Sequence, residues 1–106
     1  MAKYLFQASY TLDGTRGLIK EGGSSRRTTI EQMLKGLGGK LESMYFAFGE
    51  TDVFIVVDLP DAASAAAISL SVGAAGGARV STIPLMTPEE VDAAAKKSVK
   101  YRAPGA

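Results

Sequence analysis

The sequence predicts an α+β fold, a ferredoxin-like βαββαβ sandwich with a C-terminal helix and a four-stranded antiparallel sheet. Three observations lead to this fold class. Strand-type and helix-type patterns follow one another in that order along the 106 residues. The link over residues 49–51 is short enough to form a hairpin between the second and third strands. The third strand, which begins at Val53, is apolar on both faces, as in the interior of a sheet.

The first strand and the first helical region are predicted from an alternating pattern and its breaks. Aromatic and small residues alternate over Tyr4–Thr11, and the turn signal Asp13-Gly14 ends this strand. A short helical region around Leu12–Lys20 follows. The sequence Gly-Gly-Ser-Ser at 22–25 interrupts it and separates it from a second helix.

The second helix is predicted from an apolar stripe at helical spacing. Its members recur at i, i+3, i+4 and i+7, and they are Ile30, Met33, Leu34 and Leu37. Thr28 and Glu31 have the spacing of a capping box near the start of this helix. A glycine cluster then ends it, formed by Gly36, Gly38 and Gly39.

The middle of the chain predicts a hairpin whose second strand needs cover on both faces. Its first strand is Leu41–Phe48. In its second strand one face carries Val53, Ile55, Val57 and Leu59, and the other carries Phe54 and Val56. The helices of so short a chain can cover only one face of the sheet. We therefore expect a second copy of the chain to cover the other face, as a homodimer or a higher homo-oligomer.

An alanine-rich helix and a fourth strand complete the sandwich. Asp61 is placed to cap this helix, whose predicted buried stripe is Ala63, Ala66, Ala67 and Leu70. The fourth strand is predicted over Ala78–Met86. Pro84 within it favours a position at the sheet edge, or marks the end of strand pairing, because proline has no backbone N–H to donate to a second neighbour.

The end of the chain predicts one more helix. Thr87-Pro88-Glu89-Glu90 combines an N-cap, a proline at the first helical position and a glutamate at the third. This signature predicts a helix over Pro88–Lys97. We expect residues 1–98 to form a single domain and residues 99–106 to form a flexible tail.

Composition excludes several classes of site. The chain has neither cysteine nor histidine, so disulfides, thiolate nucleophiles, histidine bases and most zinc or copper sites are excluded, and we expect no metal and no cofactor. The net charge is only +1, and the basic residues do not form the stripe that nucleic-acid binding requires. No stretch has the length and apolar character of a membrane span or signal peptide, so we expect a cytoplasmic protein without membrane partners.

Motifs along the chain resemble those of the GYD-domain proteins of bacteria. The matching positions span nearly the whole chain, and they are Tyr10-Thr11, Gly14, Gly38-Gly39-Lys40-Leu41, Tyr45, Gly49-Glu50-Thr51-Asp52 and Pro60-Asp61. Thr51 stands where that family has a tyrosine. The resemblance implies a fold of the dimeric α/β-barrel type, in which two sheets pack face to face. It implies little about activity, because the family is largely uncharacterised and related barrels include monooxygenases, dismutases and ligand-sensing domains.

Three polar side chains of the hairpin are candidate site residues, and each has a structural alternative. Asp52 could polarise a ligand, or it could hydrogen-bond the backbone of its turn. Tyr45 could point its hydroxyl into a cavity, or it could pack in the core with the hydroxyl paired nearby. Asp58 is a charge near the end of an apolar strand, and it would need a partner if it were buried.

Six residues are predicted to contact a ligand: Thr11, Arg16, Tyr45, Gly49, Asp52 and Phe54. Arg16 belongs to a basic helical region that also contains Lys20, Arg26 and Arg27. These charges, with backbone amides freed by the glycine break, could hold a phosphate or a carboxylate. They could instead form a solvated face, and the break could be part of a lid. Aromatic side chains could line a cavity between subunits, namely Tyr10, Phe46, Phe48 and Phe54.

Three functions from different classes fit these patterns. A small-molecule-binding domain would place its pocket between sheet and helices or at the subunit interface. A cofactor-free enzyme would use Asp52 or Asp58 as a base, and Tyr45 or an arginine to stabilise negative charge. A structural or adaptor oligomer would need only the apolar face. We expect the binding domain, because few titratable side chains converge as a catalytic site requires.

Overall fold

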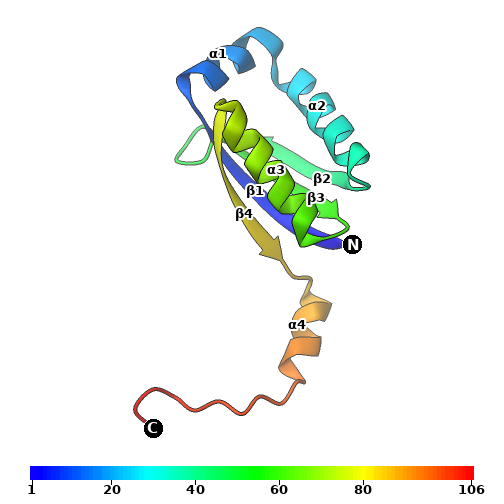
Figure 1. The fold of residues 1–106 in the computed structure, drawn as a ribbon, viewed down its shortest axis with the longest axis vertical. Helices are drawn as coiled ribbons and strands as arrows, with labels where there is room; N and C mark the ends of the chain where they lie inside the picture. The colour runs from blue at the N-terminus through cyan, green and yellow to red at the C-terminus, as the bar shows by residue number, and fades with distance from the viewer.

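The computed structural model describes residues 1–106, with the element order β-α-α-β-β-α-β-α (Figure 1). The strands are β1 (Ala2–Tyr10), β2 (Lys40–Phe46), β3 (Val53–Leu59) and β4 (Ala78–Leu85), and the helices are α1 (Leu12–Glu21), α2 (Gly23–Gly36), α3 (Ala62–Ala75) and α4 (Pro88–Ala95). Neighbouring strands are antiparallel, in the order β2-β3-β1-β4. The predicted α+β fold with its antiparallel sheet and C-terminal helix is confirmed, and Pro84 lies on an edge strand as expected.

The helices α2 and α3 cover one face of the sheet and leave the other open. Side chains of β1 and β3 alternate between the two faces, as the period of a strand requires. The covered face is the core, and its buried members on the two central strands are Tyr4, Phe6, Ala8, Val53, Ile55, Val57 and Leu59. Ile30 and Leu34 of α2 and Ala65 and Ile68 of α3 pack against them. The face of β3 that begins at Val53 is therefore buried beneath helices, as the strand pattern predicts.

A row of apolar side chains crosses the middle of the open face. The register pairs Val56 of β3 with Leu5 of β1, and Leu5 with Ile83 of β4. Directly paired residues point to the same side of a sheet. Phe54 lies one pleat further along β3, opposite Gln7. These four apolar residues, Leu5, Phe54, Val56 and Ile83, are called the open-face row below.

A β-bulge in β2 decides which side chains reach the open face. Leu41 pairs with Val57, but Ser43 pairs with Val56, so Glu42 is the extra residue. A bulge reverses the alternation of the strand that contains it. Leu41 therefore packs against the core, whereas Ser43 and Tyr45 lie on the open face. In a strand without a bulge, Tyr45 would lie on the same side as Leu41, because an even number of positions separates them. The alternative that places Tyr45 in the core is wrong, since its exposed fraction is 72%.

The predicted buried stripe of α3 is also wrong. The buried residues of this helix are Ala65 and Ile68, while Leu70 is 75% exposed and Ala63, Ala66 and Ala67 lie on the outer side. An alanine-rich helix has little difference between its faces, so the sequence pattern does not fix its rotation. The capping residue Asp61 is confirmed, because the backbone N–H of Ser64 donates to its side chain over 2.8 Å.

The start of α2 differs from the prediction in a similar way. Only Gly22, with a φ of 86°, separates α1 from α2, and Ser24 and Ser25 lie inside the helix. Thr28 donates to the carbonyl of Ser24 in the helix interior, so it forms no capping box with Glu31. The apolar stripe of α2 is confirmed, with Ile30 and Leu34 buried and Met33 and Leu37 partly buried.

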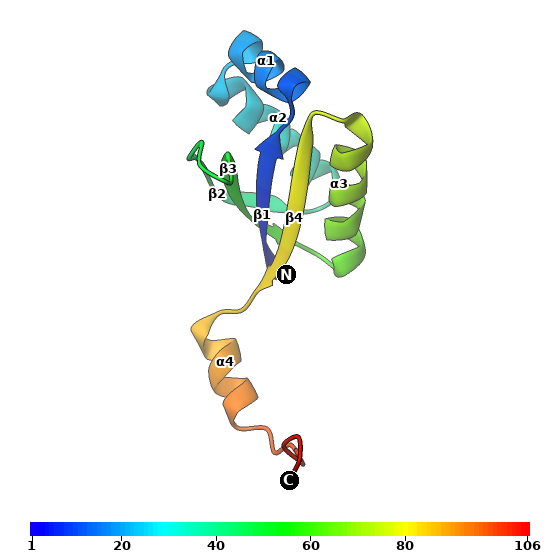
Figure 2. The same cartoon turned by 90° about the vertical axis from the view of Figure 1, so that its left-hand side faces the viewer.

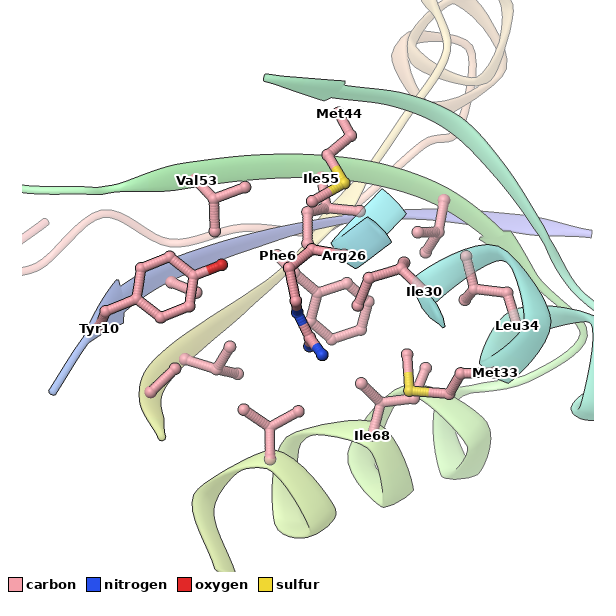
Figure 3. A pocket seen from close by; sticks show the side chains of 15 residues that line it. Phe6, Tyr10, Arg26, Ile30, Met33, Leu34, Met44, Val53, Ile55 and Ile68 are labelled. Atoms are coloured by element: carbon pink, nitrogen blue, oxygen red, sulfur yellow. The ribbon is translucent and has the colours of Figure 1, made fainter. Parts of the chain in front are cut away.

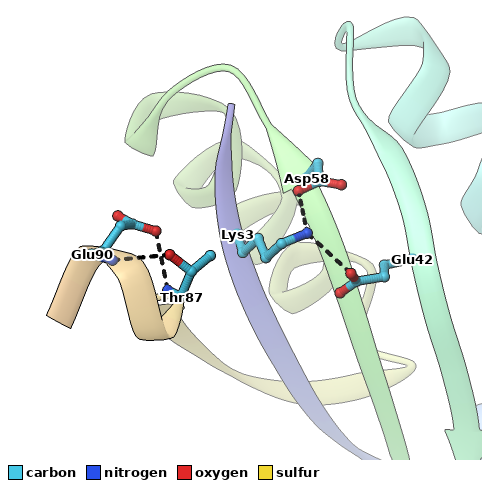
Figure 4. Close-up of polar contacts among 5 residues, drawn as sticks. All are labelled: Lys3, Glu42, Asp58, Thr87 and Glu90. Carbon is cyan, nitrogen blue, oxygen red and sulfur yellow. Dashed lines mark hydrogen bonds and ion pairs between the residues drawn. The ribbon is translucent and has the colours of Figure 1, made fainter. Parts of the chain in front are cut away.

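The helix α4 extends away from the rest of the chain. It begins with the predicted capping box, in which Thr87 and Glu90 exchange hydrogen bonds of 3.1 Å (Figure 4). Figure 2 shows α4 beyond the end of β4, on the side away from α3. None of its residues is buried. The radius of gyration is accordingly 16.8 Å, compared with about 13 Å for a compact chain of this length. None of the helices has the length and apolar character that crossing a membrane requires.

Candidate functional site

An apolar cavity lies between the covered face of the sheet and the helices α2 and α3. Its volume is about 60 Å³, and of its 15 lining residues 14 are hydrophobic. β1, β2, β3 and β4 form one side of the cavity, and α2 and α3 form the other (Figure 3). The close-up shows Met33 and Met44 on opposite sides of this space. Methionine side chains adapt their shape to irregular apolar space, so these two can adjust to a guest molecule.

Arg26 is the charged residue that lines this cavity. It comes from the first turn of α2, and its guanidinium group lies among the apolar side chains in Figure 3. Its ion-pair partner is Glu21, with 3.7 Å between the Arg26 Nη1 and Glu21 Oε2 atoms. That separation is too long for a hydrogen bond. The guanidinium group therefore forms no hydrogen bond with Glu21, and of its five N–H donors those that do not face Tyr10 can serve a ligand.

Tyr10 places a hydroxyl group at the same end of the cavity. It is the last residue of β1, and its hydroxyl points toward Arg26 in Figure 3. Burial raises the pKa of Tyr10 above 10.0, although the neighbouring Arg26 opposes this shift. The phenol is therefore neutral at physiological pH, and its O–H can donate a hydrogen bond.

A second, wider pocket adjoins the cavity and opens to solvent. Its volume is about 280 Å³, and α1 contributes Gly14, Gly17, Leu18 and Glu21 to its wall. The two spaces share Tyr10, Arg26, Val72 and Ala78 as lining residues. The arginine and the tyrosine therefore stand at the junction between an apolar interior and a more polar mouth.

Close backbone packing holds α1 over this mouth. Gly14 lies so near the carbonyl group of Gly77 that a β-carbon at position 14 would overlap it. Thr11 accepts a hydrogen bond from Gly14, caps α1, and donates its hydroxyl to Gly76 over 2.8 Å. Thr11, which was predicted to contact a ligand, is thus engaged in joining the start of α1 to the turn before β4.

The other residues predicted to contact a ligand do not come together around this cavity. Arg16 is exposed on α1 and lines neither pocket. Gly49 is exposed in the loop between β2 and β3. Tyr45 and Phe54 are paired neighbours on the open face, on the far side of the sheet from the cavity. Of the aromatic set, Tyr10 alone lines the cavity, while Phe46 and Phe48 stack on each other with ring centroids 5.8 Å apart.

Asp52 is held by the backbone of β1. Its Oδ2 atom accepts a hydrogen bond of 2.8 Å from the Tyr10 backbone N–H, and its own N–H donates to Ala8. These bonds extend the pairing of β1 and β3 into the loop. They give Asp52 a structural role, but its side chain bonds β1 and not the backbone of its own turn, as the structural alternative had supposed. The bond to the Tyr10 N–H indirectly positions Tyr10 at the cavity.

Asp58 lies in a cluster of charges at one end of the open face. Lys3 Nζ donates to Asp58 Oδ1 over 2.9 Å and to Glu42 Oε1 over 3.0 Å (Figure 4). The hydrogen bond to Asp58, followed by that to Glu42, raises the pKa of Lys3 above its ordinary value. The buried carboxylate of Asp58 therefore has the partner that its burial requires. No group of three or more acidic side chains is placed to hold a metal ion.

Sequence reasoning missed the pairing of Arg26 with Tyr10. A signal for each was present in the sequence. Tyr10 continues the alternation of Tyr4, Phe6 and Ala8, and Arg26 precedes Ile30 by four residues, so it falls on the apolar stripe of α2. A charged residue on the apolar stripe points toward the core if the helix extends far enough to include it, as α2 does for Arg26. Arg26 had instead been grouped with Arg16, Lys20 and Arg27, as a basic region that either holds an anion or forms a solvated face.

A four-stranded antiparallel sheet, helices on one face and an apolar cavity beneath them define a ferredoxin-like α+β domain. The sequence model of the GYD domain matches residues 4–95, and the chain therefore belongs to the GYD domain family. This confirms the family that the sequence motifs indicate. No match was found among curated proteins or among solved structures.

Proposed function

We propose that this protein binds a small, mainly apolar molecule in the cavity between the sheet and the helices. The observation that carries the proposal is the cavity itself, which is lined by 14 hydrophobic residues and Arg26. Apolar lining with a few convergent polar groups is the usual character of small-molecule sites. The binding function needs neither a metal nor a nucleophile, which suits a chain without histidine and cysteine.

The size of the cavity limits the ligand. A volume of about 60 Å³ takes the first few carbon atoms of an aliphatic chain and no ring, because it is less than half the roughly 150 Å³ of an engineered cavity that binds benzene. The adjoining pocket of about 280 Å³ can take the remainder of a larger molecule. We therefore expect a ligand with one slender apolar end.

The enzyme alternative has less support. Asp52 and Asp58, the proposed bases, are respectively hydrogen-bonded to the backbone of Tyr10 and paired with Lys3. Neither lines the cavity. A catalytic base must reach the proton that it removes, and these carboxylates lie outside the space where a substrate would sit.

The experiment that tests the proposal is methyl NMR of the methionines with pentan-1-ol as the probe. Met33 and Met44 line the cavity, whereas Met1 and Met86 are exposed elsewhere and serve as internal controls. We expect saturable shifts of the Met33 and Met44 methyl signals alone. Shifts confined to Met1 and Met86, or no shift at millimolar probe, would contradict the proposal.

A matched pair of variants separates filling of the cavity from a change in surface. Ala78→Leu places extra methyl groups at the junction of the two pockets, and we expect it to weaken pentan-1-ol binding by about tenfold or more. Ala63→Leu makes the same change on the exposed side of α3 and should leave binding unaltered. Equal affinities in the two variants would place the probe outside the cavity.

We further propose that the protein is a homodimer or higher homo-oligomer that pairs through the open face of the sheet. The open-face row supplies an apolar centre, and polar residues such as Gln7, Ser43 and Tyr45 surround it. A standard interface buries roughly 800 Å² on each partner. The mass of the protein in solution tests this part, and a monomer at tens of micromolar would contradict it.

The exposed C-terminal segment supports the same proposal. A helix as short as α4 is marginal in water without packing partners. Four large hydrophobic residues of this segment are nevertheless exposed: Met86, Val91, Val99 and Tyr101. A second copy of the chain, seated on the open face, would lie on the side of the sheet to which α4 extends.

A further inference from the structure

The junction of the two pockets has an unusual distribution of charge for an apolar site. Arg26 brings a positive charge to a ring of hydrophobic side chains, and about a third of its side chain (32%) is exposed, on the side of the mouth. Its ion pair with Glu21 is long, and the Glu21 side chain is 47% exposed. Solvent-exposed ion pairs of this kind contribute little to stability. The charge of Arg26 is therefore not neutralised by a strong ion pair, although the Tyr10 hydroxyl lies beside it.

Glu21 shows where an anion can meet the guanidinium group. It lines the outer pocket, and its carboxylate already stands on the mouth side of Arg26. A ligand carboxylate at the junction could replace it, because the guanidinium group offers two parallel N–H donors that match a carboxylate. The neutral hydroxyl of Tyr10 would donate a further hydrogen bond from β1.

We infer that the natural ligand is a monocarboxylate, whose charged group binds to Arg26 and Tyr10 at the junction of the two pockets and whose aliphatic chain occupies the inner cavity. This inference rests on the proposed binding function and names the ligand class of that site. A single negative charge fits, because the site offers one cation against 14 hydrophobic neighbours. A dianion would leave one charge uncompensated in apolar surroundings.

The test compares probes that share a chain and differ in the charge of the head group. Pentanoate, pentan-1-ol and pentylamine are titrated in turn while the methyl signals of Met33 and Met44 are followed. We expect pentanoate to bind about tenfold more tightly than pentan-1-ol, and pentylamine to bind least because Arg26 repels it. The preference for pentanoate should fall as salt increases.

Paired variants assign the preference to Arg26. Arg26→Gln keeps a polar side chain but removes the charge. It should weaken the binding of pentanoate about tenfold and change the affinity for pentan-1-ol by no more than about twofold. Arg27→Gln makes the same charge change at an exposed neighbour that lines neither pocket, and it should change neither affinity. Tyr10→Phe should weaken pentanoate alone, by a smaller factor.

A second pair of variants tests the competition with the internal carboxylate. Glu21→Gln frees Arg26 and should strengthen pentanoate binding by about two- to threefold. Glu31→Gln makes an equal charge change on the exposed side of α2, and it should leave pentanoate binding unchanged.

The outcomes distinguish the monocarboxylate inference from the proposed binding of a small apolar molecule, on which it rests. Equal binding of pentanoate and pentan-1-ol in the native protein, unaffected by Arg26→Gln, would overturn the monocarboxylate assignment and leave the apolar site in place. Absence of any Met33 or Met44 response to all three probes would overturn the proposed function as well. If Arg27→Gln removed the preference for pentanoate as fully as Arg26→Gln does, the preference would be a general effect of net charge. That result would also overturn the assignment.

Discussion

Gly14 is the residue on which the position of α1 depends. A β-carbon at this position would overlap the carbonyl group of Gly77, so only glycine lets α1 pack this closely on the start of β4. Gly17, one turn later in α1, has no atom within 4 Å of the place where its β-carbon would lie. Close packing therefore requires glycine at position 14 but not at position 17.

Alanine substitutions at these two positions should have opposite effects. Gly14→Ala must push α1 away from Gly77, and we expect it to lower the free energy of unfolding by about 1–3 kcal/mol. Gly17→Ala improves helix propensity without a clash and should raise it by about 0.5–1 kcal/mol. Urea denaturation of both variants measures the difference. If Gly14→Ala proved as stable as Gly17→Ala, the close contact of α1 with β4 would be incorrect.

At the scale of elements, the caps of α3 and α4 were predictable where the buried face of α3 was not. Asp61 and Thr87 were identified from local sequence alone, because a capping side chain bonds backbone only three residues away. The buried side of α3 depends on what it packs against. Ser69 hydrogen-bonds Thr82 of β4 there, in line with Ala65 and Ile68, and this contact joins residues whose proximity no local pattern reveals.

The same limit applies to the candidate site. The order of elements along the chain and the hairpin followed from turn lengths and alternation, but the cavity is lined by residues from six different elements. Arg26 and Tyr10 are far apart in sequence and meet only after α2 docks on β1. Local patterns could indicate that each faces the core. They could not indicate that the two meet at the mouth of one cavity.

The cap of α3 should make stability depend on pH in a defined direction. Hydrogen bonds from the side chain of Ser64, and then from its backbone, lower the pKa of Asp61 below 3.8. A carboxylate whose pKa is lower in the folded state stabilises the fold above its unfolded pKa, and this contribution is lost as the pH falls through the folded pKa. Asp61→Asn retains a neutral cap. We therefore expect the native protein to be more stable than this variant at pH 7, with a difference that begins to shrink near pH 4 and is lost as the pH falls through the lower pKa of the folded state.

Thermal unfolding of both proteins across that pH range measures the effect. Asp92→Asn on α4 serves as the control for an equal charge change without a capping bond. A stability difference between native and Asp61→Asn protein that persisted unchanged at pH 2 would show that the charge of Asp61 does not contribute to the cap.

At the scale of the whole molecule, two features are incomplete in a single chain. The sheet has an uncovered face with an apolar row, and α4 has a well-formed cap but no buried residue. Both lie where a partner subunit would meet them. The cavity, by contrast, is formed within one chain, so assembly and ligand binding should be separable by mutation.

Phe54→Arg should split the proposed assembly. The substitution places a charge in the open-face row, where a second copy could not solvate it. We expect a monomer by sedimentation velocity, with pentan-1-ol binding retained. Ala67→Arg, on the exposed side of α3, is the matched control and should leave the oligomer intact. A Phe54→Arg protein with unchanged mass and normal stability would remove the face-to-face arrangement.

The bulge at Glu42 bears on how evolution can vary this domain. Deleting that one residue would bring the beginning of β2 into regular alternation without moving any other side chain to the opposite face, because Leu41 and Ser43 already pair with the adjacent residues Val57 and Val56. Relatives with and without the extra residue would then differ by a gap of one in an alignment, and on this edge they would differ only by the carboxylate that Glu42 offers to Lys3. A single-codon insertion is thus a route by which the family could add a charge to its sheet edge while leaving the buried core and its cavity in place.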